Sequence, residues 1–442
     1  MIEIRNHDPG WTAQFERERA RLAHALGPLA LRIDHHGSTA VPGLAAKPII
    51  DIQISVASLK PIEAYARPLA LCGYVHRPHD DDSFAPFFHR PATWPHSHHV
   101  HVVQAESDEA RRTLAFRDYL RAHPESARDY ESLKRELAAR FIGEDAESRE
   151  AYASAKSEFV VAIVERALAE QDRASVSRYY NQFEEESRLA SGPGELEFER
   201  TKDILSRYLP PPPARVVDVG GAAGVYSIWL AGMGYEVHLV DASERLVDEA
   251  RRRSGDAARP VTTFSVSDAR ELPQADESAD AVLVMGPLYH LTRRPDRVAA
   301  LGEARRVLRG GGLVAVAAIS RCASTLDGLA RELTLDPRFV AIRDRDLVDG
   351  QHRNDVDNTT YFTTSYFHRP DDLRDELEEA GFAEPGVLGV EGPGWLMSDF
   401  VDRWTDPVRR AEVLRAARVL EHESSIVGVS AHLIGLGWKR NP

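Results

Sequence analysis

The sequence predicts an α/β protein of two domains, and three observations support that fold class. First, a chain of 442 residues is longer than a single hydrophobic core usually serves. Second, apolar segments alternate with helical patterns from residue 215 onward, which is typical of a parallel sheet with helices on both faces. Third, the region before residue 170 has its own apolar segments and amphipathic helices. We therefore expect a first domain over residues 1–170, a linker over 171–178 and a second domain over 179–442.

The composition is that of a globular protein with an acidic balance. The formal net charge is −14, so the surface as a whole repels the phosphates of nucleic acids and of anionic membranes, although a local basic pocket is compatible with it. We expect neither nucleic acid nor membrane as a partner. Two cysteines, Cys72 and Cys322, are too few for a disulfide framework or a thiolate metal cluster. No apolar run is long enough to span a bilayer, and the start MIEIRNHDPGW has no signal-peptide pattern, so a cytoplasmic protein is the expectation.

The elements of the first domain follow from hydrophobic periodicity. A helix is expected after Pro9-Gly10, because apolar residues from Trp11 to Leu26 recur at helical spacing. The polar, aperiodic segment Ala169–Ser177 is the predicted linker. The expected strands are Leu29–Asp34, Ile49–Val56 and His98–Gln104, and the expected helices are Ala110–Ala122 and Ala127–Ala169, the second broken near Gly143.

In the second domain, the prolines at Pro210–Pro213 must end any preceding helix. The apolar segments that follow are too short for helices and are bounded by glycine-rich or polar turns, which favours buried parallel strands. The expected strands are Arg215–Val219, Glu236–Val240, Val261–Ser265, Ala279–Met285 and Gly312–Ile319, and the expected helices are Ala223–Met233, Glu244–Ser254 and Arg297–Leu308.

VVDVGGAAG, at Val216–Gly224, is the strongest functional signal in the chain. Small residues directly after the first strand allow a ligand to approach the backbone closely. The second strand ends in Asp241, which can accept hydrogen bonds from both hydroxyls of a ribose. After the third strand, Asp268 can hydrogen-bond an adenine amino group, and the fourth strand ends in a Gly-Pro loop that carries Tyr289 and His290.

This ordered series resembles class I S-adenosylmethionine-dependent methyltransferases, from about Tyr179 to the carboxyl terminus. The resemblance implies a Rossmann-like domain with a mostly parallel seven-stranded sheet, and an enzyme that methylates a small-molecule acceptor with S-adenosyl-L-methionine as cofactor. The stretch Tyr179–Leu189 resembles the amino-terminal helix that caps the cofactor in such enzymes. Ala222 departs from the pattern, which commonly has a glycine there, and we expect its single methyl group to be tolerated. The resemblance assigns cofactor binding to Asp218, Gly220, Gly221, Gly224, Asp241, Asp268, Ala269, Met285 and Gly286.

The candidate catalytic residues follow from the chemistry of methyl transfer. A sulfonium methyl group is already activated, so the enzyme has mainly to align the acceptor and to exclude water. A base helps where the acceptor is a hydroxyl or an ammonium, and His290, His352 and His368 are candidates, with Tyr289 as an orienting hydroxyl. The segment Arg321–His368 is far longer than an ordinary connection of about 2–6 residues, so it is expected to build the acceptor pocket or a lid. An edge hairpin with aromatic packing is the alternative.

The first domain has a candidate phosphate site in HHGSTAVPGLAAKPIIDIQI, residues 35–54. The turn at Gly37 and Ser38 offers backbone N–H groups and a hydroxyl to an anion, and Lys47 adds a positive charge. The alternative is a tight structural turn.

The strand that follows offers a candidate metal ligand, Asp51. Two-metal nucleotidyl transfer needs several carboxylates, but the position two residues beyond is Gln53. His99 and His101 alternate onto one face of a later strand, and an aspartate with histidines suits a transition metal better than Mg²⁺. A divalent metal held by Asp51, His99 and His101 is therefore expected, with a solvated polar cluster as the alternative.

Residues 1 to about 168 resemble the GrpB family, on the segments DPGW, HHGSTAVPGLAAKPIIDI, SHHVHVV, FRDYLRAHPESARDYESLKRELA and AYASAKSEF. The fold of that family is related to nucleotidyltransferases, so the resemblance implies a nucleotidyltransferase-like α/β domain. Three roles are open for this domain. It binds a nucleotide or a phosphorylated ligand beside a methyltransferase, it transfers a nucleotidyl or phosphoryl group in a bifunctional enzyme, or it is a non-catalytic binding module.

Overall fold

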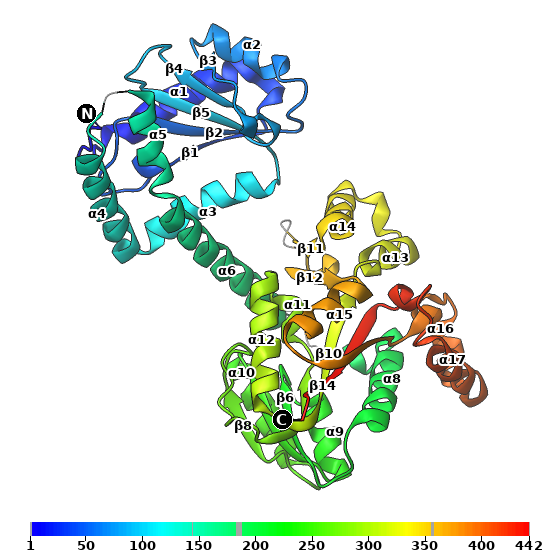
Figure 1. The fold of residues 1–442 in the computed structure, drawn as a ribbon. Coiled ribbons are helices and arrows are strands. Elements are labelled where there is room, and N and C mark those ends of the chain that lie inside the picture. The colour runs from blue at the N-terminus through cyan, green and yellow to red at the C-terminus, as the bar shows by residue number, and fades with distance from the viewer. Residues whose placement is uncertain (1, 144, 183–187, 355–357, 442) are drawn as a thin grey trace. The chain divides into compact units, whose positions relative to one another are not determined.

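The structure is a computed structural model that describes residues 2–143, 145–182, 188–354 and 358–441 (Figure 1). The chain divides into two compact units, Met1–Gln171 and Asp172–Pro442. The predicted linker over residues 171–178 is helical instead, as part of α6 (Ser157–Gln182). Asp172 is buried and accepts a hydrogen bond of 2.8 Å from the hydroxyl of Thr292. Tertiary contacts therefore order a polar segment that has no helical periodicity of its own.

The first unit is built on a five-stranded sheet. The pair β2–β5 is parallel and the other pairs are antiparallel. Side chains alternate along β2, so Ile50, Ile52 and Ile54 enter the main core while Asp51 and Gln53 lie on the opposite face. The strand order is β1 (Arg32–His36), β2 (Ile50–Val56), β5 (His98–Gln104), β4 (Phe87–Arg90) and β3 (Val75–His76).

Helices cover both faces of this sheet. The apolar stripe predicted from Trp11 to Leu26 packs on the face that carries the isoleucines of β2. On the other face, the amide nitrogen of Gln53 donates a hydrogen bond of 3.2 Å to the carbonyl of Ala110. The predicted helix over residues 127–169 is broken near Gly143 as expected, and again before Ser157. The helices are α1 (Gly10–Leu26), α2 (Glu63–Leu71), α3 (Asp108–Ala122), α4 (Pro124–Arg140), α5 (Ala146–Ser154) and the first part of α6.

The second unit is built on a nine-stranded sheet. The pairs from β8 to β10 are parallel, and β14 is antiparallel to both of its neighbours, which confirms the predicted mostly parallel, Rossmann-like sheet. Two further strands extend it, because β12 (Ser365–His368) pairs with the carboxyl end of β10 and with β11 (Gln351–His352). The seven strands of the main order are β8 (Thr263–Val266), β7 (Glu236–Asp241), β6 (Arg215–Val219), β9 (Ala279–Val284), β10 (Leu308–Ser320), β14 (His432–Trp438) and β13 (Ala383–Gly389).

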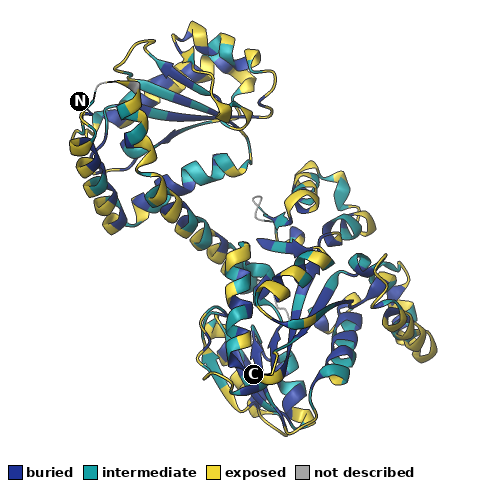
Figure 2. Ribbon diagram, viewed as in Figure 1, coloured by how far each residue is buried: buried dark blue, intermediate teal, exposed yellow. Residues whose placement is uncertain are grey.

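Two apolar layers enclose this sheet, and Figure 2 shows the buried strands between helices with exposed outer faces. One layer contains α8 (Pro193–Tyr208), α9 (Val225–Met233) and α10 (Glu244–Gly255). The other contains α11 (Pro287–His290), α12 (Arg294–Val307) and α15 (Pro370–Glu379). The remaining helices are α13 (Ala323–Ala330) and α14 (Pro337–Asp349) in the long insertion, and α16 (Phe400–Thr405) and α17 (Pro407–Leu420) near the carboxyl terminus.

Among the described residues, no helix has both the length and the apolar character that crossing a bilayer requires.

Candidate functional site

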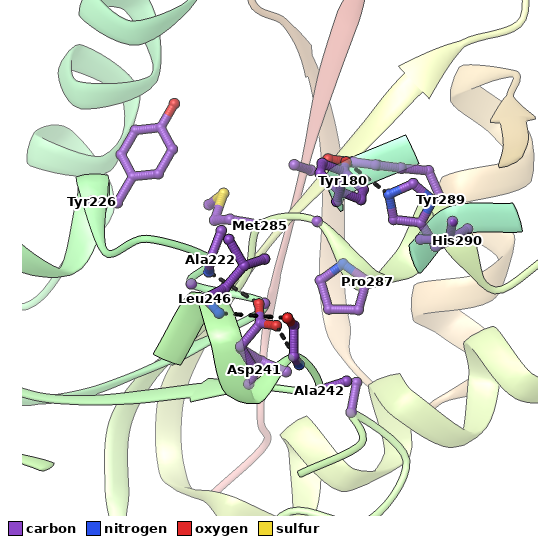
Figure 3. Close-up of a pocket in the computed structure, with 18 of the residues that line it drawn as sticks. Tyr180, Ala222, Tyr226, Asp241, Ala242, Leu246, Met285, Pro287, Tyr289 and His290 are labelled. Atoms are coloured by element: carbon purple, nitrogen blue, oxygen red, sulfur yellow. Dashed lines mark hydrogen bonds between the residues drawn. The ribbon is translucent and has the colours of Figure 1, made fainter. Parts of the chain in front are cut away.

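A cavity of about 440 Å³ opens at the carboxyl ends of β6, β7 and β9 (Figure 3). The carboxyl ends of parallel strands in an open sheet are where such folds usually bind ligands. Seven of the nine predicted cofactor residues line the cavity, namely Gly220, Gly221, Asp241, Asp268, Ala269, Met285 and Gly286.

The turn after β6 brings backbone close to the cavity. Gly220 has φ +74°, and a Cβ atom there would lie 2.2 Å from Cδ of Pro287, so any side chain would displace the loop after β9. Gly224 does not line the cavity, because it begins α9 as its N-cap with φ +82°. Ala222 tolerates its methyl group in the left-handed region, at φ +45°, a conformation that costs a non-glycine residue about 1 kcal/mol. This geometry directs the Ala222 N–H toward β7.

Asp241 ends β7 and is fixed from two sides. Its Oδ2 accepts the N–H of Ala222 at 3.0 Å, and its Oδ1 accepts the N–H of Ser243 at 2.8 Å (Figure 3). Burial raises the pKa of this carboxyl, and the two backbone donors oppose that shift. A carboxylate has about four acceptor positions, so Asp241 keeps capacity for a pair of ligand hydroxyls.

Asp218 differs from the expectation. It is fully buried, and it is absent from the described residues that line the cavity. Its Oδ2 accepts a hydrogen bond of 2.6 Å from the hydroxyl of Ser227 on α9 and packs under Gly221. Burial raises the pKa of Asp218 to about 6, with the charge of Asp241 adding to the shift. Its role is therefore to support the turn.

Asp268 lines the cavity but already has a partner. Its carboxylate binds the guanidinium of Arg270 through bonds of 2.9 and 2.7 Å, and the backbone N–H of Arg270 adds a third at 2.9 Å. These bonds lower the pKa of Asp268. Arg270 also binds Asp296 at 2.9 Å, so a network orients the carboxylate at the cavity wall.

His290 is held as a neutral ring. Burial lowers its pKa to about 4. Nδ1 lies 3.4 Å from the carbonyl of Thr364, which can only accept, so Nδ1 carries the proton and Nε2 accepts the hydroxyl of Tyr180 at 2.9 Å. Tyr289 lies beside His290 on the same wall (Figure 3). Two of the predicted catalytic residues, Tyr289 and His290, therefore line the cavity. The Nε2 atom of His290 is occupied by the Tyr180 hydroxyl, so His290 can act on a substrate only through Tyr180 or after Tyr180 moves.

His352 is brought to a different place. Its Nδ1 lies 2.9 Å from a carboxylate oxygen of Asp346 and its Nε2 lies 2.6 Å from the carbonyl of Tyr361, while its ring stacks on Phe367. With both nitrogens bound to acceptors, His352 anchors the insertion. His368 is also buried and bound, with Nε2 3.2 Å from Glu376.

A second cavity, of about 590 Å³, lies against the first. Residues of the insertion line it, including His352, Tyr361 and Phe362, and its use as an acceptor pocket stays a prediction. The predicted capping stretch Tyr179–Leu189 also contributes, although residues 183–187 lie outside the described residues. The residues that line both cavities are Tyr180, Arg188, Glu197, Tyr289 and His432.

Sequence reasoning missed an ion-pair group at this junction. Nδ1 of His432, at the start of β14, lies 2.6 Å from Oε1 of Glu391 and 3.4 Å from Oε2 of Glu197. Burial lowers the pKa of His432, but the two carboxylates outweigh burial and raise it overall. Arg188 also donates hydrogen bonds to Glu197 from both terminal nitrogens of its guanidinium group. No local signal indicates this group, because its members come from α8, β14 and the loop after β13.

In the first unit, the predicted metal set does not assemble. Asp51 lies beside His99, with 3.2 Å between Oδ1 and Nδ1. His101 is two residues further along β5, roughly 7 Å at the spacing of a strand. Within the described ranges, the single group of three candidate ligands gathered closely enough for one ion is Glu197, Glu391 and His432 of the second unit. The ligand atoms of these three residues are thus not gathered around one point in the structure, and a divalent metal held by Asp51, His99 and His101 stays a prediction.

The predicted phosphate residues do lie around Asp51. Gly37 has φ +66°, and a Cβ atom there would lie 2.4 Å from Oδ2 of Asp51. Ser38 follows it and is hydrogen-bonded to the hydroxyl of Tyr130. The charge of Asp51 acts on the ammonium of Lys47, whose pKa burial lowers to about 8.

Comparison with known proteins separates the two units. Residues 1–166 match the family model of the GrpB protein, and residues 216–312 match that of a methyltransferase domain. A UPF0157 protein of Pseudomonas aeruginosa is 40% identical over 38% of this chain and 68% of its own length. The chain belongs to the GrpB family. A methyltransferase domain follows the GrpB domain. The UPF0157 protein YqkA of Bacillus subtilis is 34% identical over 38% of this chain and 47% of its own length, so the chain spans about half of that relative.

Solved structures resemble each part. The crystal structure of GrpB from Enterococcus faecalis is 32% identical, with 38% of this chain and 99% of that chain covered and a TM-score of 0.35. A methyltransferase from Thermotoga maritima, described as a possible histamine N-methyltransferase, is 20% identical, with 60% of this chain and 97% of that chain covered and a TM-score of 0.37.

Proposed function

We propose that the second unit of this GrpB-family chain transfers a methyl group from S-adenosyl-L-methionine to a small-molecule acceptor. One observation carries the proposal: a fixed carboxylate, Asp241, is hydrogen-bonded to the glycine-rich turn and lines the cavity at the strand ends. The residues present fit the cofactor. Asp241 suits a ribose, the missing side chain of Gly220 leaves room beside Pro287, and Met285 and Ala269 offer apolar walls to an adenine.

When bound, S-adenosyl-L-methionine supplies an activated methyl group on a sulfonium centre. The protein has then to orient the acceptor and to keep water out. Tyr180 and Tyr289 line both cavities, so their hydroxyls are placed to orient an acceptor that enters from the second cavity. His290 holds the Tyr180 hydroxyl through Nε2 and thereby positions it.

The second cavity suits a small acceptor with both aromatic and polar character. Its walls include Tyr179, Phe362 and Trp395, together with the carboxyl of Asp327. His432 lies where the two cavities meet. We therefore place the acceptor in this cavity, with its nucleophilic atom near His432.

Two measurements test the proposal. Calorimetric titration of S-adenosyl-L-methionine into the full chain is expected to give saturable binding. Incubation of the full chain with a methyl-labelled donor and a fractionated metabolite extract is expected to label small molecules, read by mass spectrometry. A chain that binds no donor would sink the proposal.

For the GrpB unit we propose ligand binding rather than nucleotidyl transfer. Gln53 supports this choice, because it shares a sheet face with Asp51 but is fully buried and donates to the carbonyl of Ala110. It therefore supplies no second carboxylate for a metal pair. Incubation of the full chain with nucleoside triphosphates and Mg²⁺ is expected to give no turnover that depends on Asp51. Turnover that disappears in Asp51→Ala would favour the transferase instead.

A further inference from the structure

The chain uses lysine sparingly. Of its 55 lysine and arginine residues, six are lysines. Three of the six gather at one place in the first unit. They are Lys47, which follows the Gly37-Ser38 turn, Lys134 on α4, and Lys156 between α5 and α6. Arginine supplies most of the positive charge of this chain, so a gathering of three lysines in one place calls for a specific cause.

Two of these ammonium groups share one aromatic ring. Nζ of Lys47 lies 4.0 Å from the ring centre of Tyr152, and Nζ of Lys156 lies 4.6 Å from it. Tyr152 is buried, and its hydroxyl has no hydrogen-bond partner among the described residues. A buried hydroxyl without a partner is costly, so it points to a missing one.

The third ammonium group is adjacent. Lys134 is 2% exposed, its Nζ lies 4.7 Å from the ring centre of Tyr130, and it donates a hydrogen bond to the carbonyl of Ala45. The Tyr130 hydroxyl bonds in turn to Ser38, which places Lys134 beside the Gly37-Ser38 turn.

The positive charge at this place exceeds the negative charge. Asp51 is the carboxylate that acts on all three lysines, and it also binds His99. Glu131 acts on Lys134 but is bonded to Arg135 and to the N–H of Ala45. In the part of the chain that the structure describes, the ammonium groups of Lys47 and Lys156 make no ion pair and no hydrogen bond.

The positive charges of these ammonium groups repel one another, and a bound anion would reduce that repulsion. Burial and the nearby charge of Lys156 together lower the pKa of Lys134 to about 7. Burial and Lys156 likewise lower the pKa of Lys47. Ammonium groups held together without counter-charges favour a multiply charged anion between them.

We propose that Lys47, Lys134 and Lys156, with the hydroxyl of Tyr152, bind the phosphate groups of a di- or polyphosphate ligand. Lysine suits this ligand because ammonium groups are point charges that can converge on tetrahedral oxyanions, whereas the planar guanidinium fork matches a carboxylate or a single phosphate side by side. The inference deepens the binding role proposed for the GrpB unit and names its chemistry.

Inorganic pyrophosphate is the probe for the first test, by calorimetry on the full chain at neutral pH. Lys156→Met and Lys47→Met are each expected to weaken binding at least about tenfold, because each removes a charge-assisted contact. Lys60→Met is the matched control, since Lys60 is an exposed lysine of the same unit, and it is expected to change binding less than about twofold. Absence of saturable binding to the unsubstituted chain, or equal affinity of the variants and the control, overturns the proposal.

A second measurement uses the unsubstituted chain and so avoids any effect of substitution on folding. Limiting acetic anhydride is added to the full chain with and without pyrophosphate, and acetylation of each lysine is read by mass spectrometry. Pyrophosphate is expected to protect Lys47 and Lys156 and to leave Lys60, Lys202 and Lys439 unprotected. Pyrophosphate binding without this protection contradicts the lysine site but leaves the binding role intact. Nucleotide turnover that depends on Asp51 contradicts the binding role itself.

Discussion

The backbone N–H of Ala222 donates a hydrogen bond of 3.0 Å to Oδ2 of Asp241, which ties the turn after β6 to the end of β7. Ala222 makes this bond from a left-handed conformation, and Asp241 is held by a second bond from Ser243. The bond therefore fixes the carboxylate before any ligand arrives. Preorganisation of this kind lowers the entropy cost of binding.

Asp241→Asn is expected to weaken binding of S-adenosyl-L-methionine by about 10- to 100-fold, because the amide offers one acceptor oxygen where the carboxylate offers two. The matched control is Asp248→Asn, at an exposed position on α10 that pairs with Arg251. Calorimetry on both variants checks this. Equal affinities in the two variants would show that Asp241 does not contribute to donor binding.

Gly220→Ala is expected to destabilise the second unit by more than about 1 kcal/mol and to weaken donor binding by at least about tenfold. The added methyl group would lie 2.2 Å from Pro287 and would need a positive φ. Gly232→Ala is the control, because Gly232 is exposed on α9 with open space around it, and alanine there is expected to add about 0.5–1 kcal/mol of stability. Urea unfolding and donor titration measure both. Similar behaviour of the two variants would contradict the close approach at Gly220.

The first unit is expected to lose stability in acid through His36. Burial lowers the pKa of this ring to about 3, whereas an unfolded histidine has a pKa of about 6.5. Between these two pKa values the unfolded chain binds the proton and the folded chain does not, so stability falls as pH falls through this window. His36 alone accounts for about 2 kcal/mol at pH 5.

His36→Gln tests this, with the exposed His24→Gln as control. Hydrogen exchange of peptides from β1 and β2, compared at pH 7 and about pH 5, reports the stability of the unit within the full chain. The change between the two pH values is expected to be smaller in His36→Gln than in the control. If the change between pH 7 and about pH 5 is the same in His36→Gln as in the control, His36 takes up its proton in the folded state.

The His432–Glu391 pair is expected to stabilise the second unit at low rather than high pH. The neighbouring carboxylates raise the pKa of His432 above its unfolded value, so its contribution is fully present below about pH 6.5 and is lost as pH rises through the folded pKa. Glu391→Gln is therefore expected to cost about 2 kcal/mol at pH 6 and clearly less at about pH 9. Thermal unfolding at both pH values measures this, with the exposed Glu378→Gln as control. A cost that is equal at both pH values would contradict the ion pair.

Some residues of the site were predictable because their signals are local. The glycine turn, Asp241 and Asp268 each follow a strand directly, and the carboxyl ends of consecutive parallel strands meet at one edge of the sheet. The order of strands therefore predicted that these residues line one cavity. Gly224 and Asp218 were the exceptions, because Gly224 begins α9 and the side chain of Asp218 is directed at Ser227 of that helix.

Other contacts had no local signal. His432 and Glu391 meet because β14 lies antiparallel to β13, and a strand inserted between β10 and β13 cannot be placed from its own residues. Lys134 and Lys156 meet Lys47 only after α4 and the start of α6 pack around Asp51.

The sequence by itself determined the two-domain α/β organisation, the parallel sheet and the glycine-rich turn that lines the cavity, because periodicity and strand-end residues act over a few positions of the chain. Tertiary structure alone decided that residues 171–178 are helical and that three lysines converge near Asp51. Those outcomes depend on distances between segments remote in the chain. Such distances are set by the packing of whole elements against each other.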